Sequence, residues 1–255
     1  MTFILPSFGA SAISAVPASG GGVFNNSYAV EFDGSNQYMA VTGITLSTAK
    51  TVSFWIKLDS TATDDVLFGN NGGRYYPYMP NNQRVNISNA SQVKILDLTA
   101  SHALSANTWH HLVIVGDGTT AKLYKDGVYR ATADDIAPGG TLTNIGGASL
   151  NGNRFLAGKL DEFSIFGSAL SDTDGSALSI GDTAGGDVAA LYNSGSPPDI
   201  GTNGLNLSPV HWWRMGDSET GVSNGSTTPT TITDLGSGNN DGALTNSPTF
   251  STDVP

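Results

Sequence analysis

The residue of this sequence that is most clearly suited to a chemical role is Asp161, which interrupts the apolar run KLDEFSIF at residues 159–166. Successive side chains of a strand point to opposite faces, so Asp161 is predicted to share a face with Phe163 and Ile165 and to point toward the rim of the core. A buried carboxylate is costly unless a cation or several hydrogen-bond donors accompany it. Two interpretations are therefore open: Asp161 accepts from backbone N–H groups, or it helps to hold a metal ion.

A second candidate group is aromatic. Arg74, Tyr75, Tyr76 and Tyr78 follow the turn NNGG at residues 70–73. Aromatic faces stack on sugar rings, and a neighbouring arginine can donate to hydroxyl groups. The same side chains would also suit a sheet edge or a subunit interface. This group is therefore a candidate for contact with a glycan or with another subunit.

The histidines give little sign of catalysis. His110 and His111 are neighbours on one predicted strand, so their side chains point to opposite faces and cannot chelate one ion together. His211 has no acid at the spacing of a catalytic triad. The sequence contains no cysteine, which excludes disulfides, thiolate metal sites and a cysteine nucleophile.

Composition favours a β protein. The 255 residues include 32 glycines, and 38% are hydrophobic while only 13% are charged, which is typical of many short strands joined by polar turns. The net charge is −11, and no cluster of Lys and Arg offers a phosphate-binding face, so nucleic-acid binding is not expected. No segment approaches the roughly 18 apolar residues of a membrane span.

The elements that position these residues follow from local patterns. Alternating residues predict a hairpin at 28–41 and a strand at 51–58, the latter with Trp55 on its more exposed face. Residues 109–115 are apolar on both faces, as in a central strand. Asp126-Gly127 supplies the tight turn of a further hairpin. One short helix is predicted at 186–193, and the whole indicates an all-β sandwich.

At this point four motifs resemble a known family, the laminin-G-like and pentraxin-like branch of the concanavalin A-like jelly rolls. AVEFDGSNQYMAV is similar to its opening hairpin, and TVSFWIKL to its second strand. NTWHHLVIVGDGTTAKLYKDGVYRAT resembles its most diagnostic strand pair, and GKLDEFSIFGSALSD followed by DVAALYNSG resembles its closing strand and trailing helix. The resemblance implies a jelly roll of two antiparallel sheets.

The same resemblance bears on the site. It implies that Asp161 and Asp33, in the FDG turn, hold a structural Ca²⁺, a cation that prefers oxygen ligands. Glycanases of this architecture carry their two carboxylates in a Glu-x-Asp-x-x-Glu motif, which is absent here. The chain is therefore not expected to be an enzyme.

The order of the motifs is unusual. Members of the family begin with a W-x-x-x-D strand, a Ser-Gly-Asn turn and Gly-x-Leu, whereas here Trp213 to Asp217 and residues 234–244 carry these motifs at the other end. The sequence thus predicts a circular permutation with three parts: an extended arm at 1–22, a sandwich at 23–195, and a segment at 196–255. The last segment is expected to complete its own sandwich or, by strand exchange, that of a neighbour.

These features lead to a hypothesis of surface binding. The Gly-, Ser-, Thr- and Asn-rich texture resembles virion proteins of marine bacteriophages. The first expectation is a structural or adhesive protein on a virion surface, of the decoration or tail-fibre type, whose partners are copies of itself and neighbouring particle subunits, with cell-surface glycans as further ligands. The alternative is a carbohydrate-binding lectin module, soluble or secreted and extracellular; a glycoside hydrolase is the minor alternative.

Overall fold

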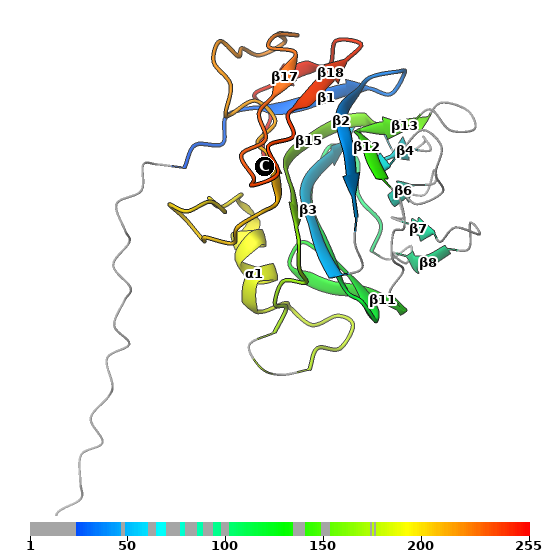
Figure 1. Cartoon of the computed structure of the whole chain (residues 1–255). Helices are drawn as coiled ribbons and strands as arrows, with labels where there is room; N and C mark the ends of the chain where they lie inside the picture. Colours follow the sequence, from blue (N-terminus) through cyan, green and yellow to red (C-terminus); the bar gives the residue numbers. More distant parts are fainter. Residues whose placement is uncertain are drawn as a thin grey trace, which may run out of the picture.

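The computed structural model describes residues 24–46, 49–60, 65–69, 77–79, 86–88, 94–97, 102–134, 141–148, 154–173, 175 and 177–255. In these residues the chain forms two facing antiparallel sheets with one short α-helix (Figure 1). The predicted all-β sandwich of two antiparallel sheets is confirmed. The predicted arm at 1–22 lies outside the described residues.

The larger sheet has the order β11-β10-β9-β3-β15-β1-β19, and β16 pairs with β15 beside this path. Its strands are β1 (Ala29–Asp33), β3 (Ala49–Leu58), β9 (Trp109–Asp117), β10 (Thr120–Lys125), β11 (Val128–Asp134), β15 (Ala157–Phe166), β16 (His211–Trp213) and β19 (Thr249–Ser251). Of the long central strands β3, β9 and β15, β9 contains residues 109–115, which the sequence predicts to be apolar on both faces.

The second sheet has the order β17-β18-β2-β12-β5. It contains β2 (Tyr38–Thr45), β5 (Phe68–Gly69), β12 (Thr141–Ile145), β17 (Thr231–Ile232) and β18 (Gly242–Thr245). Smaller pairings involve β4 (Asp65–Val66), β6 (Pro77–Met79), β7 (Asn86–Ser88) and β8 (Lys94–Asp97), and β13 (Gly147–Ala148) with β14 (Arg154–Phe155). The helix α1 (Gly186–Tyr192) continues into the 3₁₀ turn η2 (Asn193–Gly195).

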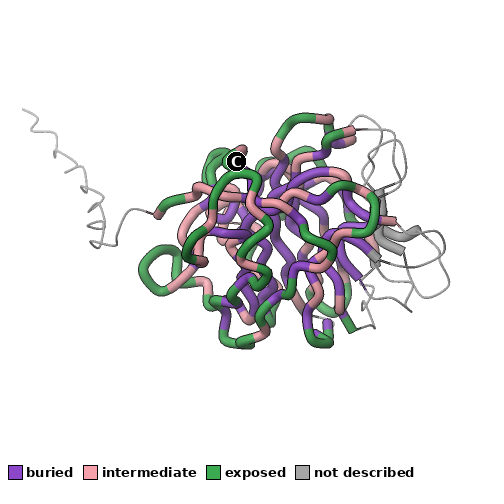
Figure 2. The backbone as a smooth tube through the Cα atoms, turned by 90° about the horizontal axis from the view of Figure 1, so that it is seen from above, coloured by how far each residue is buried: buried purple, intermediate pink, exposed green. Residues whose placement is uncertain are grey.

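The main core lies between the two sheets. Phe54 of β3 stacks on Phe163 of β15 with ring centroids 5.3 Å apart, and Phe68 of β5 meets Phe163 edge-on. Figure 2 shows this buried interior, with the exposed residues gathered in the peripheral turns. Burial of such apolar side chains is the dominant stabilising contribution in a sandwich without disulfides.

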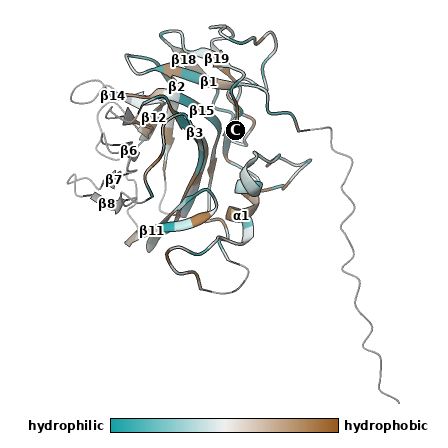
Figure 3. Ribbon diagram, turned by 180° about the vertical axis from the view of Figure 1, so that it is seen from behind, coloured by the Kyte–Doolittle hydropathy of each residue, from teal (hydrophilic) through white to brown (hydrophobic). Residues whose placement is uncertain are grey.

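A second apolar layer covers the outer face of the larger sheet. Helix α1 lies on this face (Figures 1 and 3), where Val188 packs on Val113 and Tyr124. Tyr192 stacks on Trp55 with ring centroids 6.0 Å apart, and Trp55 is only 4% exposed. The prediction of a more exposed face for β3 was therefore wrong, because the helix covers the side that a two-layer sandwich would leave to solvent.

The C-terminal segment pairs with strands of its own chain in this structure. β16 pairs with β15, β18 with β2 and β19 with β1. The side chain of Asp253 also connects the C-terminal segment to β3 and β9, since its two oxygens accept from Lys57 Nζ at 2.7 Å and from Trp109 Nε1 at 3.1 Å. Exchange of these strands between copies in an assembly stays a prediction.

Among the described residues, no helix has both the length and the apolar character needed to cross a membrane.

Candidate functional site

A β-bulge in β15 creates the most unusual local geometry of the large sheet. Asp161 lies opposite Trp55 of β3, but Ser164 lies opposite Ser53, so β15 carries one extra residue over this interval. Within the bulge Glu162 has a φ of 47°, a left-handed conformation that non-glycine residues rarely adopt. Bulges of this kind redirect side chains and are common beside functional sites.

The bulge changes which side chains share a face. Leu160, Phe163 and Ile165 all belong to the core between the sheets, whereas Asp161 lies beside Trp55 on the outer face. The prediction that Asp161 shares a face with Phe163 and Ile165 was therefore wrong. Strict alternation cannot hold across an inserted residue.

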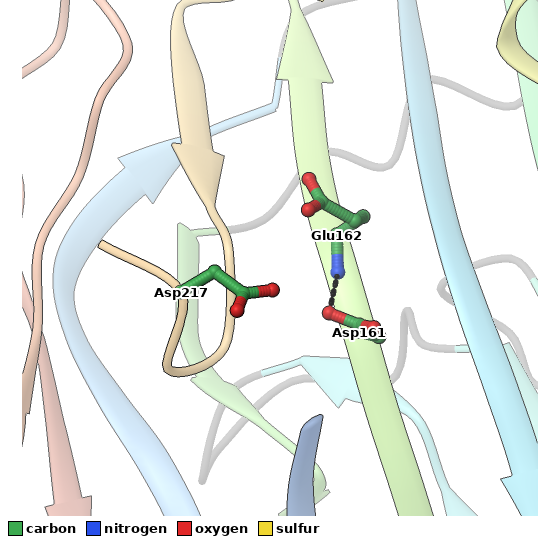
Figure 4. A group of neighbouring side chains, drawn as sticks. All are labelled: Asp161, Glu162 and Asp217. Atoms are coloured by element: carbon green, nitrogen blue, oxygen red, sulfur yellow. Dashed lines mark hydrogen bonds between the residues drawn. The ribbon is translucent and has the colours of Figure 1, made fainter. Parts of the chain in front are cut away.

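The redirected side chains form an acidic cluster of Asp161, Glu162 and Asp217 (Figure 4). One carboxylate oxygen of each lies within 4.8 Å of the others. Asp161 and Glu162 come from β15, and Asp217 comes from the turn after β16, where the sequence has the W-x-x-x-D motif. Three carboxylates at this separation repel one another strongly unless protons or cations intervene.

Asp161 has few hydrogen-bond donors for a fully buried carboxylate. Its Oδ1 accepts from the backbone N–H of Glu162 at 2.8 Å, and its Oδ2 accepts from Asn26 Nδ2 at 3.0 Å. The Oδ1 atom of the same Asn26 amide is buried and has no hydrogen-bond partner among the described residues. A buried oxygen without a donor therefore lies beside the acidic cluster.

Glu162 connects the cluster to the C-terminal segment. Its two oxygens accept from Trp212 Nε1 at 2.6 Å and from Arg214 Nε at 2.9 Å. Arg214 Nη2 lies 3.5 Å from Asp217 Oδ2 and donates to the Asn25 carbonyl at 2.6 Å. One guanidinium thus serves two of the three carboxylates and cannot neutralise the cluster alone.

The pKa values follow from burial first and from the neighbouring charges and hydrogen-bond donors second. Burial, followed by the charge of Glu162, raises the pKa of Asp161 well above its ordinary range. Burial raises the pKa of Glu162 to about 7, although Arg214 acts in the opposite direction. Burial likewise raises the pKa of Asp217. The cluster is therefore a place where a proton or a cation is energetically favoured.

A groove of about 490 Å³ lies beside this cluster, and Trp212 and Arg214 form part of its wall. It is lined by two aromatic rings, one arginine and a majority of polar or small residues: Phe24, Asp199, Gly201, Thr202, Asn203, Asn206, Ser208, Pro209, Trp212, Arg214, Leu235 and Ser237. We refer to it below as the Trp212 groove. It is built from three segments of the chain that are far apart in sequence.

The wall of the Trp212 groove is a stacked arrangement. Phe24 stacks on Trp212 with ring centroids 6.4 Å apart, and the Arg214 guanidinium lies 4.1 Å from the centre of the Phe24 ring. Because Glu162 holds both Trp212 Nε1 and Arg214 Nε, the acidic cluster fixes the orientation of this wall. Rigid aromatic surfaces with adjacent polar groups are characteristic of ligand pockets.

The structure does not bring Asp33 to Asp161. Asp33 lies opposite Ala157, four residues along β15 from Asp161, a separation of about 13 Å at the rise of a strand. Its Oδ1 accepts from the backbone N–H of Ser35 at 2.8 Å and so caps its own turn. The predicted metal pair is corrected accordingly: the acidic neighbours of Asp161 are Glu162 and Asp217.

Of the predicted aromatic group, Arg74, Tyr75 and Tyr76 lie outside the described residues. Tyr78 is in β6, and its side chain also lies outside the description. Their predicted role in glycan or subunit contact stays a prediction.

His211 does have an acidic partner, which sequence spacing missed. Its Nδ1 lies 2.7 Å from Oδ2 of Asp234, a residue 23 positions further along the chain. The Gly and Asn residues of the loop at 234–240 bring the two together. His211 also stacks on Trp213 at 5.3 Å, and this pair fixes the loop against β16.

Comparison with known proteins identifies the family. Residues 33–174 match Laminin_G_3, the Concanavalin A-like lectin/glucanases superfamily. The match spans more than half of the chain, and the chain belongs to this family. A search of curated proteins found no match.

Among solved structures, a candidate carbohydrate-binding protein from Bacteroides ovatus superposes with a TM-score of 0.61 at 17% identity, over 90% of this chain. The chain spans 61% of the length of that protein. A heptameric SAP-like pentraxin from Limulus polyphemus gives a TM-score of 0.47 at 14% identity, over 57% of this chain and 78% of the pentraxin. The CBM40 module of a Ruminococcus gnavus sialidase gives 0.45 at 18% identity, over 56% of this chain and 92% of the module.

Proposed function

We propose that this chain is a non-catalytic, lectin-like module that binds carbohydrate in the Trp212 groove. The observation that carries the proposal is the chemistry of the groove lining. The partly exposed ring of Phe24 and an edge of Trp212, which is 6% exposed, lie among hydroxyl, amide and carboxylate side chains. A sugar presents the complementary pattern, with apolar ring faces and hydroxyl groups at the edges.

The polar residues of the groove lie where a ligand can reach them. Thr202, Asn203, Asn206 and Ser208 are exposed and belong to one loop after η2. The amide of Asn offers both a donor and an acceptor, and the hydroxyl of Ser or Thr offers the same pair on one atom. Hydroxyl groups of a sugar need both functions, so this loop supplies suitable partners.

The family and the Bacteroides ovatus neighbour support carbohydrate binding more directly than they support a virion role. The family is one of lectins and glucanases, and that neighbour is a candidate carbohydrate-binding protein. None of the relatives reported above is a virion protein. Binding of extracellular glycans, the alternative in the sequence analysis, is therefore our first proposal. Assembly on a particle becomes the second hypothesis.

Burial of the acidic cluster supports a non-catalytic function. Retaining glycosidases need two carboxylates about 5–5.5 Å apart and open to substrate. The cluster has short separations, but Asp161 is 0% exposed and Glu162 is 7% exposed. Both oxygens of Glu162 are also occupied by Trp212 and Arg214. These carboxylates are placed to support the groove wall rather than to attack a glycosidic bond.

A structural cation is a further proposal for the cluster, because the family resemblance implies Ca²⁺. The donor set fits the chemistry of calcium, since Asp161, Asp217 and the unpartnered Asn26 Oδ1 are all oxygen ligands. Glu162 fits less well, because Trp212 and Arg214 occupy its oxygens. A bound cation would stabilise the junction between residues 25–28, β15 and the turn after β16.

The proposed function is tested by glycan-array binding followed by calorimetry on a bound oligosaccharide. Replacing Thr202 and Asn203 together with alanine is expected to weaken binding about tenfold, the effect of roughly 1.4 kcal/mol of lost hydrogen bonding. Thr119→Ala, an exposed change in the turn between β9 and β10, is the matched control and should bind as the wild type does. Silence across the array would contradict carbohydrate binding, and an undiminished affinity of the double variant would contradict the groove as its location.

A further inference from the structure

The charges around the Trp212 groove determine which carbohydrates it can accept. Of the residues that line the groove, Asp199 is the acid and Arg214 the base. These two charges are opposite, and an arginine in a groove can pair with the carboxylate of an acidic sugar. Arg214, however, is already paired with carboxylates of the protein.

Arg214 is committed to protein partners on three sides. Its Nε donates to Glu162 at 2.9 Å, and its Nη2 lies 3.5 Å from Asp217. The face of the guanidinium lies over the Phe24 ring at 4.1 Å. Two of the three guanidinium nitrogens, Nε and Nη2, therefore already donate to protein partners, which disfavours bidentate capture of a carboxylate or sulfate.

The charge of Arg214 is offset once the cluster behind the wall is included. Arg214 faces the two carboxyl groups of Glu162 and Asp217, whereas burial raises the pKa of Asp161 well above its ordinary range and favours its neutral form. Asp199 contributes a further negative charge in the groove itself, where its Oδ1 accepts from the Gly201 N–H at 2.8 Å. An acidic ligand would meet the charge of Asp199, and among the described residues that line the groove there is no lysine or second arginine to compensate it.

We propose that the Trp212 groove is specific for neutral oligosaccharides and discriminates against uronic, sialic and sulfated sugars. The inference rests on the proposed function and adds the class of ligand. Asp199 contributes in two ways: it accepts hydrogen bonds from sugar hydroxyls, and it repels anionic substituents. Arg214 is a positioning residue, held by Glu162 so that it orients Phe24 and Trp212.

The test is a binding panel at low ionic strength, where screening is weakest. The neutral probes are cellohexaose, xylohexaose, mannohexaose and arabinohexaose, and the acidic probes are hexagalacturonate and sialyllactose. The expected result for the wild-type protein is binding to at least one neutral probe and measurably weaker binding to hexagalacturonate and sialyllactose. A preference for an acidic probe would overturn the neutral specificity and leave the proposed function standing.

A charge variant sharpens this test. Asp199→Asn keeps the oxygen that accepts from Gly201 and removes the negative charge, so it should raise the affinity for hexagalacturonate about two- to fourfold. Asp33→Asn makes the same change in net charge far from the groove and should have no such effect. Equal responses of the two variants would overturn the role of Asp199, and silence of every probe would count against carbohydrate binding itself.

Discussion

Two buried acidic sites flank β16, and they differ in how many donors their carboxylates receive. Asp234, whose side chain is 0% exposed, accepts from the N–H groups of Trp212, Gly236 and Asn240 at 2.8 Å each and pairs with His211 at 2.7 Å. Asp161 is equally buried but has two donors and two carboxylate neighbours.

This difference separates a structural carboxylate from one with capacity for a ligand. Around Asp234 the chain itself supplies the partners that a buried charge requires, so the site organises the loop at 234–240. Around Asp161 the chain supplies one arginine for three carboxylates, and the remainder must come from protons or a cation. The first site holds a loop in place, and the second is the one for which we propose support of the groove wall and a bound cation.

The largest expected effect on stability is at Asp234, whose carboxylate receives a full set of hydrogen-bond donors. Asp234→Ala leaves three N–H groups and the His211 ring without their acceptor, and it should lower the free energy of unfolding by about 3–5 kcal/mol. Chemical denaturation measures this. Asp33→Ala removes an exposed carboxylate that caps only its own turn and should cost about 1 kcal/mol or less. Similar losses in the two variants would show that the four partners of Asp234 stabilise the fold no more than the bond of an ordinary turn does.

A buried base extends the comparison. His111 Nδ1 has no partner among the described residues, and burial lowers the pKa of His111 to about 3. The folded state therefore keeps the ring neutral while the unfolded state protonates near its ordinary pKa of 6.5, so stability is lost as pH falls below that value.

The measurement is the pH dependence of unfolding in wild-type protein and in His111→Gln, which does not titrate. When the pH is lowered from 7 to 4, the unfolding free energy of the wild type should fall by about 3 kcal/mol more than that of His111→Gln. Because the other titrating groups are common to both proteins, parallel pH profiles would mean that His111 is not held neutral.

The strands, turns and helix of the sandwich were largely predictable from sequence, because each depends on a local pattern of residues. The Asp33-Gly34 turn, the strand at 51–58 and the helix at 186–193 follow from alternation, turn residues and capping. The motifs at Trp213 and at residues 234–244 indicated a permuted order, which stays a prediction, and the structure pairs this segment with β2 and β15. Burial of Trp55 was missed, since it depends on where α1 packs rather than on the strand itself.

The site was less predictable, because it depends on register and on distant segments. The bulge at Glu162 is defined by the pairing of β15 with β3, which no local pattern reveals. The Trp212 groove combines Phe24 with residues of the segment at 196–255. Asp161 was singled out as an acid within an apolar run, but its neighbours could be found only from the fold.

A smaller effect is expected from calcium. If a cation binds the acidic cluster, calcium at a hundredfold excess over its Kd stabilises the protein by about 2.7 kcal/mol, and EDTA removes this gain. Asp161→Asn should abolish the response in thermal melts, whereas Asp33→Asn should retain it. A wild-type melting temperature that is indifferent to both calcium and EDTA would contradict the cation proposal, and loss of the response in Asp33→Asn would contradict the corrected set of ligands.

The most direct test of the central claim is NMR observation of the indole N–H signals during titration with the neutral oligosaccharides. The chain has four tryptophans, and the signal of Trp212 can be assigned by its loss in Trp212→Phe. Binding in the groove predicts that the Trp212 signal shifts with ligand concentration while that of Trp109, which donates to Asp253 and does not line the groove, stays in place. Saturable binding that leaves the Trp212 signal unmoved would contradict the account.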